Sequence, residues 1–249
     1  MLFEKELKAI YDELFDKCKT CNACNTDELI KKSEKHYLYS YAAKVGSNYD
    51  NSPLKILVIG QEQPKNRESV FSSPSDTAAN PHWERTLLTI AKCLKYDDNN
   101  TLNSLEESKD MTKLYKLTTD FAFTNIYKCA FSKDGNWSGS SVIHNNNMAK
   151  ECSKLFLKEL DILKPDLIIK QGKWNSDEIE KGINKNDNKK IYKNKDINIS
   201  LYKYNYFPDK PLYVIYSYHP TCRNPNWHNH KYALYECIDC FKKEFHENK

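Results

Sequence analysis

The sequence predicts an α/β fold, a three-layer α/β/α sandwich with a central four-stranded parallel sheet. Four short apolar segments alternate along the chain with segments whose apolar residues recur at helical spacing. Strands that are apolar along their whole length fit a sheet covered on both faces, and strands that alternate with helices are typical of parallel sheets. A chain of 249 residues is long enough for one substantial core, so we expect a single domain over residues 1–249.

Each predicted element has a local signal. Pro81 suits a helix start and Pro165 ends a helix. Apolar residues at helical spacing predict helices over 2–17, 81–96, 147–165 and 230–245. Apolar and β-branched runs predict strands over 53–60, 121–131, 166–172 and 211–220. Residues 176–211 are the least regular part of the chain, and the alternation over 190–207 predicts a hairpin.

Composition excludes some classes of protein. No apolar run approaches the roughly 18 residues of a membrane span, and the charged segment MLFEKELKAIYDELF is unlike a secretory signal. We therefore expect a cytoplasmic protein without membrane contact, and a monomer. The formal net charge of +4 permits a polyanionic partner. In a reducing compartment the nine cysteines are available for metal ligation, catalysis or burial rather than for a disulfide framework.

Polar side chains occur where the predicted strands end. Glu62 follows the first strand, Asn125 lies in the second and His219 is at the end of the fourth. The ligand crevice of a parallel α/β sheet lies outside the carboxyl ends of its strands, so we expect these three side chains to converge on one edge. Taken singly, Glu62 fits a solvated acid and His219 a capped, hydrogen-bonded histidine.

The chain contains four motifs in the order VIGQEQP, FTNIYKC, CSKLFLKELDILKPDLIIKQG and HPTCRNP. In sequence and in order they resemble those of the uracil-DNA glycosylase superfamily, most closely its iron-sulfur branch, family 4. The resemblance implies a monofunctional DNA glycosylase that flips a pyrimidine out of DNA, hydrolyses its N-glycosidic bond and leaves an abasic site. Breaking that bond develops positive charge on the sugar and negative charge on the base, so a carboxylate and a hydrogen-bond donor suit it.

The resemblance also assigns roles to single residues. Glu62 would position or activate water, with Gln61 beside it on the substrate side. His219 would donate to the base oxygen that becomes anionic. Phe71 resembles the family's stacking phenylalanine, and Asn125 resembles the asparagine whose amide reads the pairing edge of a pyrimidine.

Two loops depart from the family pattern. Arg223 and Asn224 would lie near the DNA phosphates, in a tip that is two residues shorter than the family's His-Pro-x-x-x-x-Arg-Asn-Pro. The span KNRESVFSSPSDTAANPHWERT lacks the acidic stretch and the Pro-Phe-x-Gly-x-Ala-Gly segment with which the family shapes its uracil pocket. Three hypotheses therefore stay open: base-excision repair of uracil, antiviral removal of hypermodified cytosine from phage DNA, and DNA binding by a metal-containing module without catalysis.

Four cysteines resemble the ligands of the branch's 4Fe-4S cluster. Thiolates suit such a cluster, since soft sulfur ligands match its iron. The four cysteines are Cys18, Cys21, Cys129 and Cys152. Cys24 stays an alternative to Cys18, because Cys21-x-x-Cys24 has the same spacing. Four thiolates also form structural zinc sites, and the colour of the purified protein would distinguish the two metals.

The remaining organisation follows from the same comparison. The resemblance indicates a cysteine-bearing N-terminal helix over 1–25 and an insertion over 27–52, since the interval before Gly60 is longer than in the family. A second pair, Cys237 and Cys240, lies on a predicted helix and faces its apolar side, so we expect burial rather than ligation.

Overall fold

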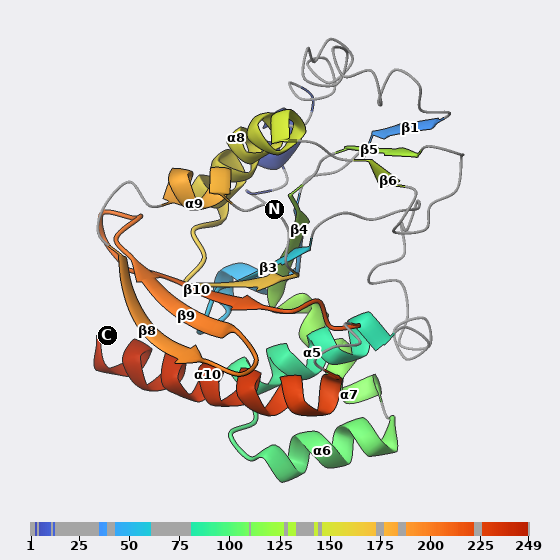
Figure 1. Ribbon diagram of the computed structural model, residues 1–249, viewed down its shortest axis with the longest axis vertical. Helices are drawn as coiled ribbons and strands as arrows, with labels where there is room; N and C mark the ends of the chain where they lie inside the picture. Colours follow the sequence, from blue (N-terminus) through green and yellow to red (C-terminus); the bar gives the residue numbers. More distant parts are fainter. Residues whose placement is uncertain are drawn as a thin grey trace.

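The protein is built around one mixed sheet of seven strands with helices on both faces (Figure 1). Its strand order is β2-β4-β3-β7-β10-β9-β8. The computed structural model describes residues 3, 5–10, 12, 35–38, 43–60, 81–109, 111–126, 129–132, 142–143, 146–172, 177–183, 188–221 and 226–248.

The four central strands are parallel, and each falls within a predicted strand. They are β4 (Phe121–Asn125), β3 (Ile56–Gly60), β7 (Leu167–Gln171) and β10 (Leu212–Ser217), in that spatial order. Every residue of β3 and β7 is buried, which fits the apolar run of β3 and the three apolar residues that begin β7. The predicted α/β class is confirmed, but a sheet of only four strands is not what the structure contains.

Three antiparallel strands enlarge the sheet at its two edges. They are β2 (Lys44–Val45) beside β4, and β9 (Ile199–Tyr204) and β8 (Asn188–Asn194) beyond β10. The last two form the predicted hairpin. The two-residue strand β2 lies within the range interpreted as an insertion, and two residues are too few to show an alternating pattern.

The second predicted strand, 121–131, is wrong in length. The chain leaves the main sheet after Asn125, and Cys129 begins a strand of a separate three-stranded antiparallel sheet. That sheet consists of β1 (Lys35–Leu38), β5 (Cys129–Ser132) and β6 (Val142–Ile143). One apolar run therefore supplies two sheets, which periodicity alone does not reveal.

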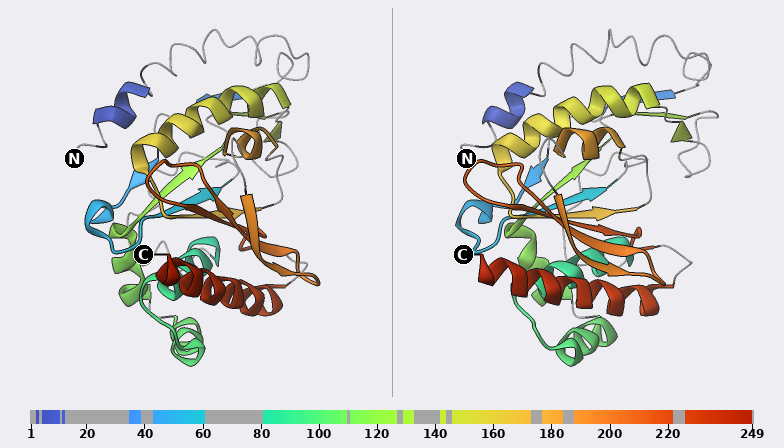
Figure 2. Two further views of the ribbon diagram at one scale, coloured as in Figure 1. Left: turned by 90° about the vertical axis from the view of Figure 1, so that its left-hand side faces the viewer. Right: turned by 60° about the vertical axis from the view of Figure 1, so that its left-hand side comes forward.

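Helices cover the two faces of the main sheet separately (Figure 2). One face carries α5 (Pro81–Leu94), α6 (Asn99–Ser108), α7 (Met111–Tyr115), the 3-10 turn η2 (Lys116–Thr119) and α10 (Trp227–Glu247). The other face carries α8 (Asn146–Leu163), α9 (Asp177–Ile183) and the N-terminal helical residues 5–10. The 3-10 turn η1 (Tyr49–Asn51) follows β2. Of the helices in these described ranges, none is long and apolar enough to cross a lipid bilayer.

Side chains of the central strands alternate between two apolar cores. On β7, Leu167 and Ile169 pack toward α5 and α10, whereas Ile168 packs toward α8. The same alternation continues to the last residue of each strand, so it decides which face a polar side chain joins at the strand's end.

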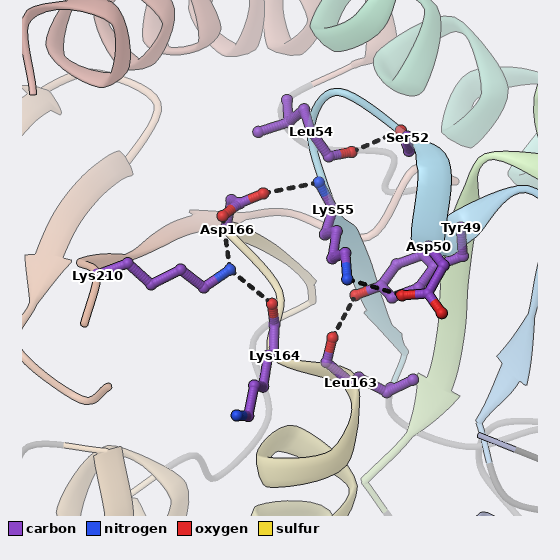
Figure 3. Close-up of polar contacts among 9 residues, drawn as sticks. All are labelled: Tyr49, Asp50, Ser52, Leu54, Lys55, Leu163, Lys164, Asp166 and Lys210. Carbon is purple, nitrogen blue, oxygen red and sulfur yellow. Dashed lines mark hydrogen bonds and ion pairs between the residues drawn. The ribbon is translucent and has the colours of Figure 1, made fainter. Parts of the chain in front are cut away.

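The amino ends of β3 and β7 are joined by a polar network around Asp166 (Figure 3). One carboxylate oxygen accepts from the backbone N–H of Lys55 at 2.8 Å, and the other accepts from Lys210 Nζ at 2.6 Å. Lys210 also donates to the carbonyl of Lys164 at 2.7 Å, and the Tyr49 hydroxyl donates to the carbonyl of Leu163 at 3.3 Å. This end of the sheet is held together by contacts between protein groups.

Candidate functional site

The opposite, carboxyl edge of the sheet brings together the ends of the four parallel strands. Gly60 of β3 is the register partner of Asn125 of β4, and Gln171 of β7 is the partner of Ser217 of β10. Asn125 follows Phe123 by two residues, so its side chain joins the face covered by α5.

Asn125 lies directly over Gly60. A Cβ atom built on Gly60 would be 2.6 Å from Asn125 Oδ1 and 3.2 Å from a ring carbon of Phe123. The absence of a side chain at Gly60 therefore makes room for the amide. Within the described part of the chain, Asn125 Oδ1 is buried and has no hydrogen-bond partner. A buried acceptor without a partner destabilises the folded state, which favours a role outside folding for this amide.

His219 follows β10 at the same edge and is half-buried. Its Nδ1 is 2.8 Å from Thr221 Oγ1 and 3.3 Å from the backbone nitrogen of Thr221, which donates to it. A backbone N–H can only donate, so Nδ1 must offer a lone pair, and the hydrogen-bond network assigns the ring proton to Nε2. Burial lowers the pKa of His219, which keeps the ring neutral at pH 7. His219 is thus a neutral imidazole with an Nε2–H donor.

The first turn of α5 contacts both β4 and the segment that follows β10. His82 stacks on His219, with ring centroids 4.7 Å apart and an interplanar angle of 20°. The next residue, Trp83, makes an edge contact with Phe123 at 4.9 Å between centroids. A series of ring contacts therefore runs across the parallel strands from His219 to Phe123, which lies two residues before Asn125 on β4.

Two further contacts fix α5 against the strand ends. The Gln171 amide donates to Thr86 Oγ1 at 3.0 Å, and Thr86 Oγ1 donates to the carbonyl of His82 at 2.7 Å. Arg85 Nη1 donates to the carbonyl of Pro220 at 2.6 Å. Pro220 directly follows His219, so α5 holds both the ring and the backbone of this segment.

The start of α10 is anchored just beyond the tip that follows His219. Asn226 caps the helix by accepting from the backbone N–H of Asn229 at 3.1 Å. Trp227 Nε1 donates to Glu106 Oε1 at 2.7 Å, and Lys231 Nζ donates to Glu106 Oε2 at 2.7 Å. Both chain ends of the tip, Thr221 and Asn226, are thus fixed by short-range or α6 contacts.

Five other residues to which the resemblance assigns a role lie outside the described residues: Gln61, Glu62, Phe71, Arg223 and Asn224. The stretch with the first three begins after Gly60, and the tip with the last two follows Thr221. Both stretches thus start from the carboxyl edge of the sheet.

The predicted metal ligands are only partly described. Cys152 is buried in the second turn of α8, at 4% exposure. The backbone of Cys129 begins β5, and Cys18 and Cys21, like Cys24, lie outside the described residues. Among the side chains that are described, no group of three or more His, Cys, Asp or Glu residues could hold a metal ion.

Burial of the C-terminal cysteine pair was predicted correctly for its first member. Cys237 is fully buried in the core of α5 and α10, and Cys240 is half-buried beside it. Burial raises the pKa of both thiols, and it raises the pKa of the nearby Cys93 to about 12. Protonated thiols in an apolar core act as packing groups rather than as ligands or nucleophiles.

Sequence reasoning missed His82, Arg85 and Gln171. A signal was present for the first two, because PHWERT places an imidazole and a guanidinium one turn apart directly after a helix-starting proline. Searches of the chain against protein-family models and against curated protein sequences find no match.

Proposed function

We propose that the protein is a monofunctional DNA glycosylase that removes a pyrimidine base. The proposal depends on one observation: a neutral histidine with an Nε2–H donor and an amide with an unpaired, buried oxygen occupy the same face at the carboxyl edge of the parallel strands. A pyrimidine has hydrogen-bonding groups on its pairing edge and a carbonyl oxygen next to the glycosidic nitrogen. An amide can read the former, and an N–H can donate to the latter.

In this proposal His219 stabilises the leaving base. As the glycosidic bond lengthens, its electron pair moves onto the base, and negative charge accumulates on the carbonyl oxygen next to the glycosidic nitrogen. A donor already placed at that oxygen lowers the barrier, because it needs no reorganisation while the charge develops. The base reaches this edge only after it has left the stack of the DNA helix. The free energy needed to unstack it must be offset by contacts between the enzyme and the DNA.

Glu62 is proposed as the group on the sugar side. Its chain position, two residues after Gly60, puts it in the stretch that starts beside Asn125. A carboxylate there would stabilise the positive charge on the sugar and orient the water that attacks it. Phe71 and Gln61 are proposed to contact the base, and Arg223 and Asn224 to contact phosphates.

A 4Fe-4S cluster is proposed as a structural cofactor, held by Cys18 or Cys24 together with Cys21, Cys129 and Cys152. The burial of Cys152 at the start of α8 suits a ligand that is protected from solvent. Iron and acid-labile sulfide in the purified protein would support the cluster, whereas stoichiometric zinc would replace it by a structural zinc site.

The function is tested with single- and double-stranded oligonucleotides that contain one uracil. We expect an alkali-sensitive abasic site and no borohydride-trapped adduct, since a monofunctional enzyme uses water rather than an amine. His219→Ala and Glu62→Gln should each lower the rate by about 100- to 1,000-fold. Asp166→Asn, at the amino ends of the strands, is the matched control and should keep the rate. If the unaltered protein, His219→Ala and Glu62→Gln bind DNA equally well and none of them releases a base, the protein is a DNA-binding module.

A modified pyrimidine is the second candidate substrate. The stretch between Gly60 and α5 lacks the glycines expected of a uracil pocket, and that stretch would face the C5 position of the base. We propose to incubate the protein with DNAs carrying uracil, 5-hydroxymethylcytosine or glucosylated cytosine and to identify the released base by mass spectrometry. Release from modified phage DNA with sparing of unmodified host DNA would favour a defence enzyme over a repair enzyme.

A further inference from the structure

We propose that His82 and Arg85 are positioning residues for His219, which together hold its imidazole in the orientation and tautomer that donate through Nε2. This inference rests on the proposed function and adds two residues that no motif assigned. It is based on two contacts within the described residues. The ring of His82 stacks on the ring of His219, and the guanidinium of Arg85 donates to the backbone carbonyl of Pro220, the next residue.

The His82 ring restricts how His219 can turn. The two imidazoles are 20° from parallel at 4.7 Å, so one face of His219 is covered by another ring. His82 in turn makes an edge contact with Trp83, whose own ring rests on Phe123 of β4. Rotation of the His219 ring would therefore have to displace a side chain that is wedged against the sheet.

Arg85 fixes the backbone on which His219 is mounted. Its guanidinium donates to the carbonyl of Pro220 and lies over the ring of Trp227, with 5.2 Å to the ring centroid. Pro220 precedes the tip and Trp227 begins α10 after it, so Arg85 joins the two ends of the tip. A single side chain thus couples the position of the imidazole to the loop proposed to meet DNA.

The surroundings of His219 favour its neutral form. On the α5 side His82 stacks on its ring, and Arg85 bonds the carbonyl of the next residue, Pro220; on the α10 side His230 contacts Tyr218 at 6.0 Å between ring centroids. The carboxylate of Glu106 on α6 is already bound by Trp227 and Lys231. Burial lowers the pKa of His219, and a proton on Nδ1 would also oppose the N–H of Thr221.

The test follows the nitrogen resonances of His219 by NMR in protein labelled at histidine, as a function of pH. In the unaltered protein we expect the Nε2–H tautomer. His82→Ala should mix the tautomers, raise the pKa of His219 toward its ordinary value and lower kcat by about 10- to 100-fold with little change in KM. The acid limb of the pH–rate profile should move up together with the pKa. His82→Phe keeps a stacking ring and should restore most of the rate.

Controls separate positioning from a general loss of structure. His228→Ala removes an exposed histidine of α10 that also contacts an aromatic ring, Tyr232, and should change neither the tautomer nor the rate. Arg85→Ala should loosen the tip and lower both the rate and DNA affinity. If His82→Ala does not fold, His82→Phe and His82→Gln are compared instead, since only the former keeps the stack.

The outcomes distinguish this inference from the proposed function. An unchanged tautomer, pKa and rate in folded His82→Ala would overturn the positioning role while leaving a glycosylase intact. If His219→Ala itself has no effect on base release, the proposed chemistry is wrong, yet the NMR experiment still decides whether His82 orders the His219 ring.

Discussion

The packing of Asn125 over Gly60 gives the sharpest test of the site, because it predicts a change in stability that does not depend on any assay of function. Gly60→Ala places a Cβ atom 2.6 Å from Asn125 Oδ1, which is closer than two such atoms can lie. The Gly60 backbone is not strained, since it belongs to a strand and Gly172 is the glycine with positive φ among the described residues. The obstacles to alanine are therefore its neighbours, chiefly Asn125 Oδ1 and to a lesser degree a ring carbon of Phe123 at 3.2 Å.

The expected energies can be worked out from that contact. Overpacking costs about 1–3 kcal/mol, and replacing a strand glycine by alanine returns about 0.5–1 kcal/mol. Gly60→Ala should then destabilise by about 1 kcal/mol, and by about 2–4 °C in Tm for a chain of this size. Asn125→Ala removes a buried oxygen without a partner, so it should cost little or even stabilise. In the double variant the overlap with Oδ1 is gone, and a coupling of about 1–2 kcal/mol is expected.

Urea unfolding of the four proteins, followed by tryptophan fluorescence and circular dichroism, measures this coupling. Gly182→Ala is the matched control, because its Cβ atom would meet Leu157 at 2.5 Å on the other face of the sheet. Its cost should not change when Asn125 is replaced. Strict additivity of Gly60→Ala and Asn125→Ala would show that the amide does not occupy the space above Gly60. Asn125→Ala should nevertheless abolish most base release, so stability and activity should move in opposite directions.

Three further predictions concern other parts of the molecule. Burial, together with the charge of Arg85, lowers the pKa of His230 to about 4, so the unfolded state binds more protons than the folded state below pH 6.5. The free energy of unfolding should therefore fall by about 3 kcal/mol from pH 6.5 to 4. Urea titrations should show a flatter pH dependence for His230→Phe. Asp166→Asn should lower the free energy of unfolding by about 1–3 kcal/mol at unchanged activity per folded molecule, because it breaks the network at the amino ends of the strands; a parallel loss of specific activity would contradict the separation of the two ends. Cys152→Ala should lose iron and colour, whereas Cys237→Ala should keep both by metal analysis, since only the former is a proposed ligand.

The central fold was predictable because its signals are local. Buried parallel strands appear as continuous apolar runs, and α5, α8 and α10 show helical spacing with proline at the start of α5 and after the end of α8. The helices α6 and α7 were not predicted, although Asp98 accepts from the backbone N–H groups of Asn100 and Thr101 as the cap of α6. The short strand β2 and the change of sheet after Asn125 were missed as well, since both depend on which distant strand is available for pairing.

The site divides along the same line. The rule that ligands bind at the carboxyl ends of parallel strands predicted that Glu62, Asn125 and His219 meet at one edge, and the structure describes the last two there. The stacking of His82 on His219 was not predictable, because it depends on how α5 packs against a segment 137 residues later in the chain. A sequence pattern shows that both side chains are present but not that they are in contact.

The two ends of one sheet differ in how they use polar groups. At the amino ends, Asp166 is satisfied by a backbone amide and a lysine, which is the arrangement that folding alone favours. At the carboxyl ends, Asn125 keeps a buried oxygen without a partner among the described residues, and Gly60 gives up a side chain to accommodate it. Partnerless buried atoms also occur elsewhere, as at the Tyr213 hydroxyl, so such an atom alone is weak evidence. A glycine that makes room for an otherwise unfavourable amide, at the same edge of the sheet as a histidine whose pKa is lowered by burial, favours the proposal that this edge binds a ligand.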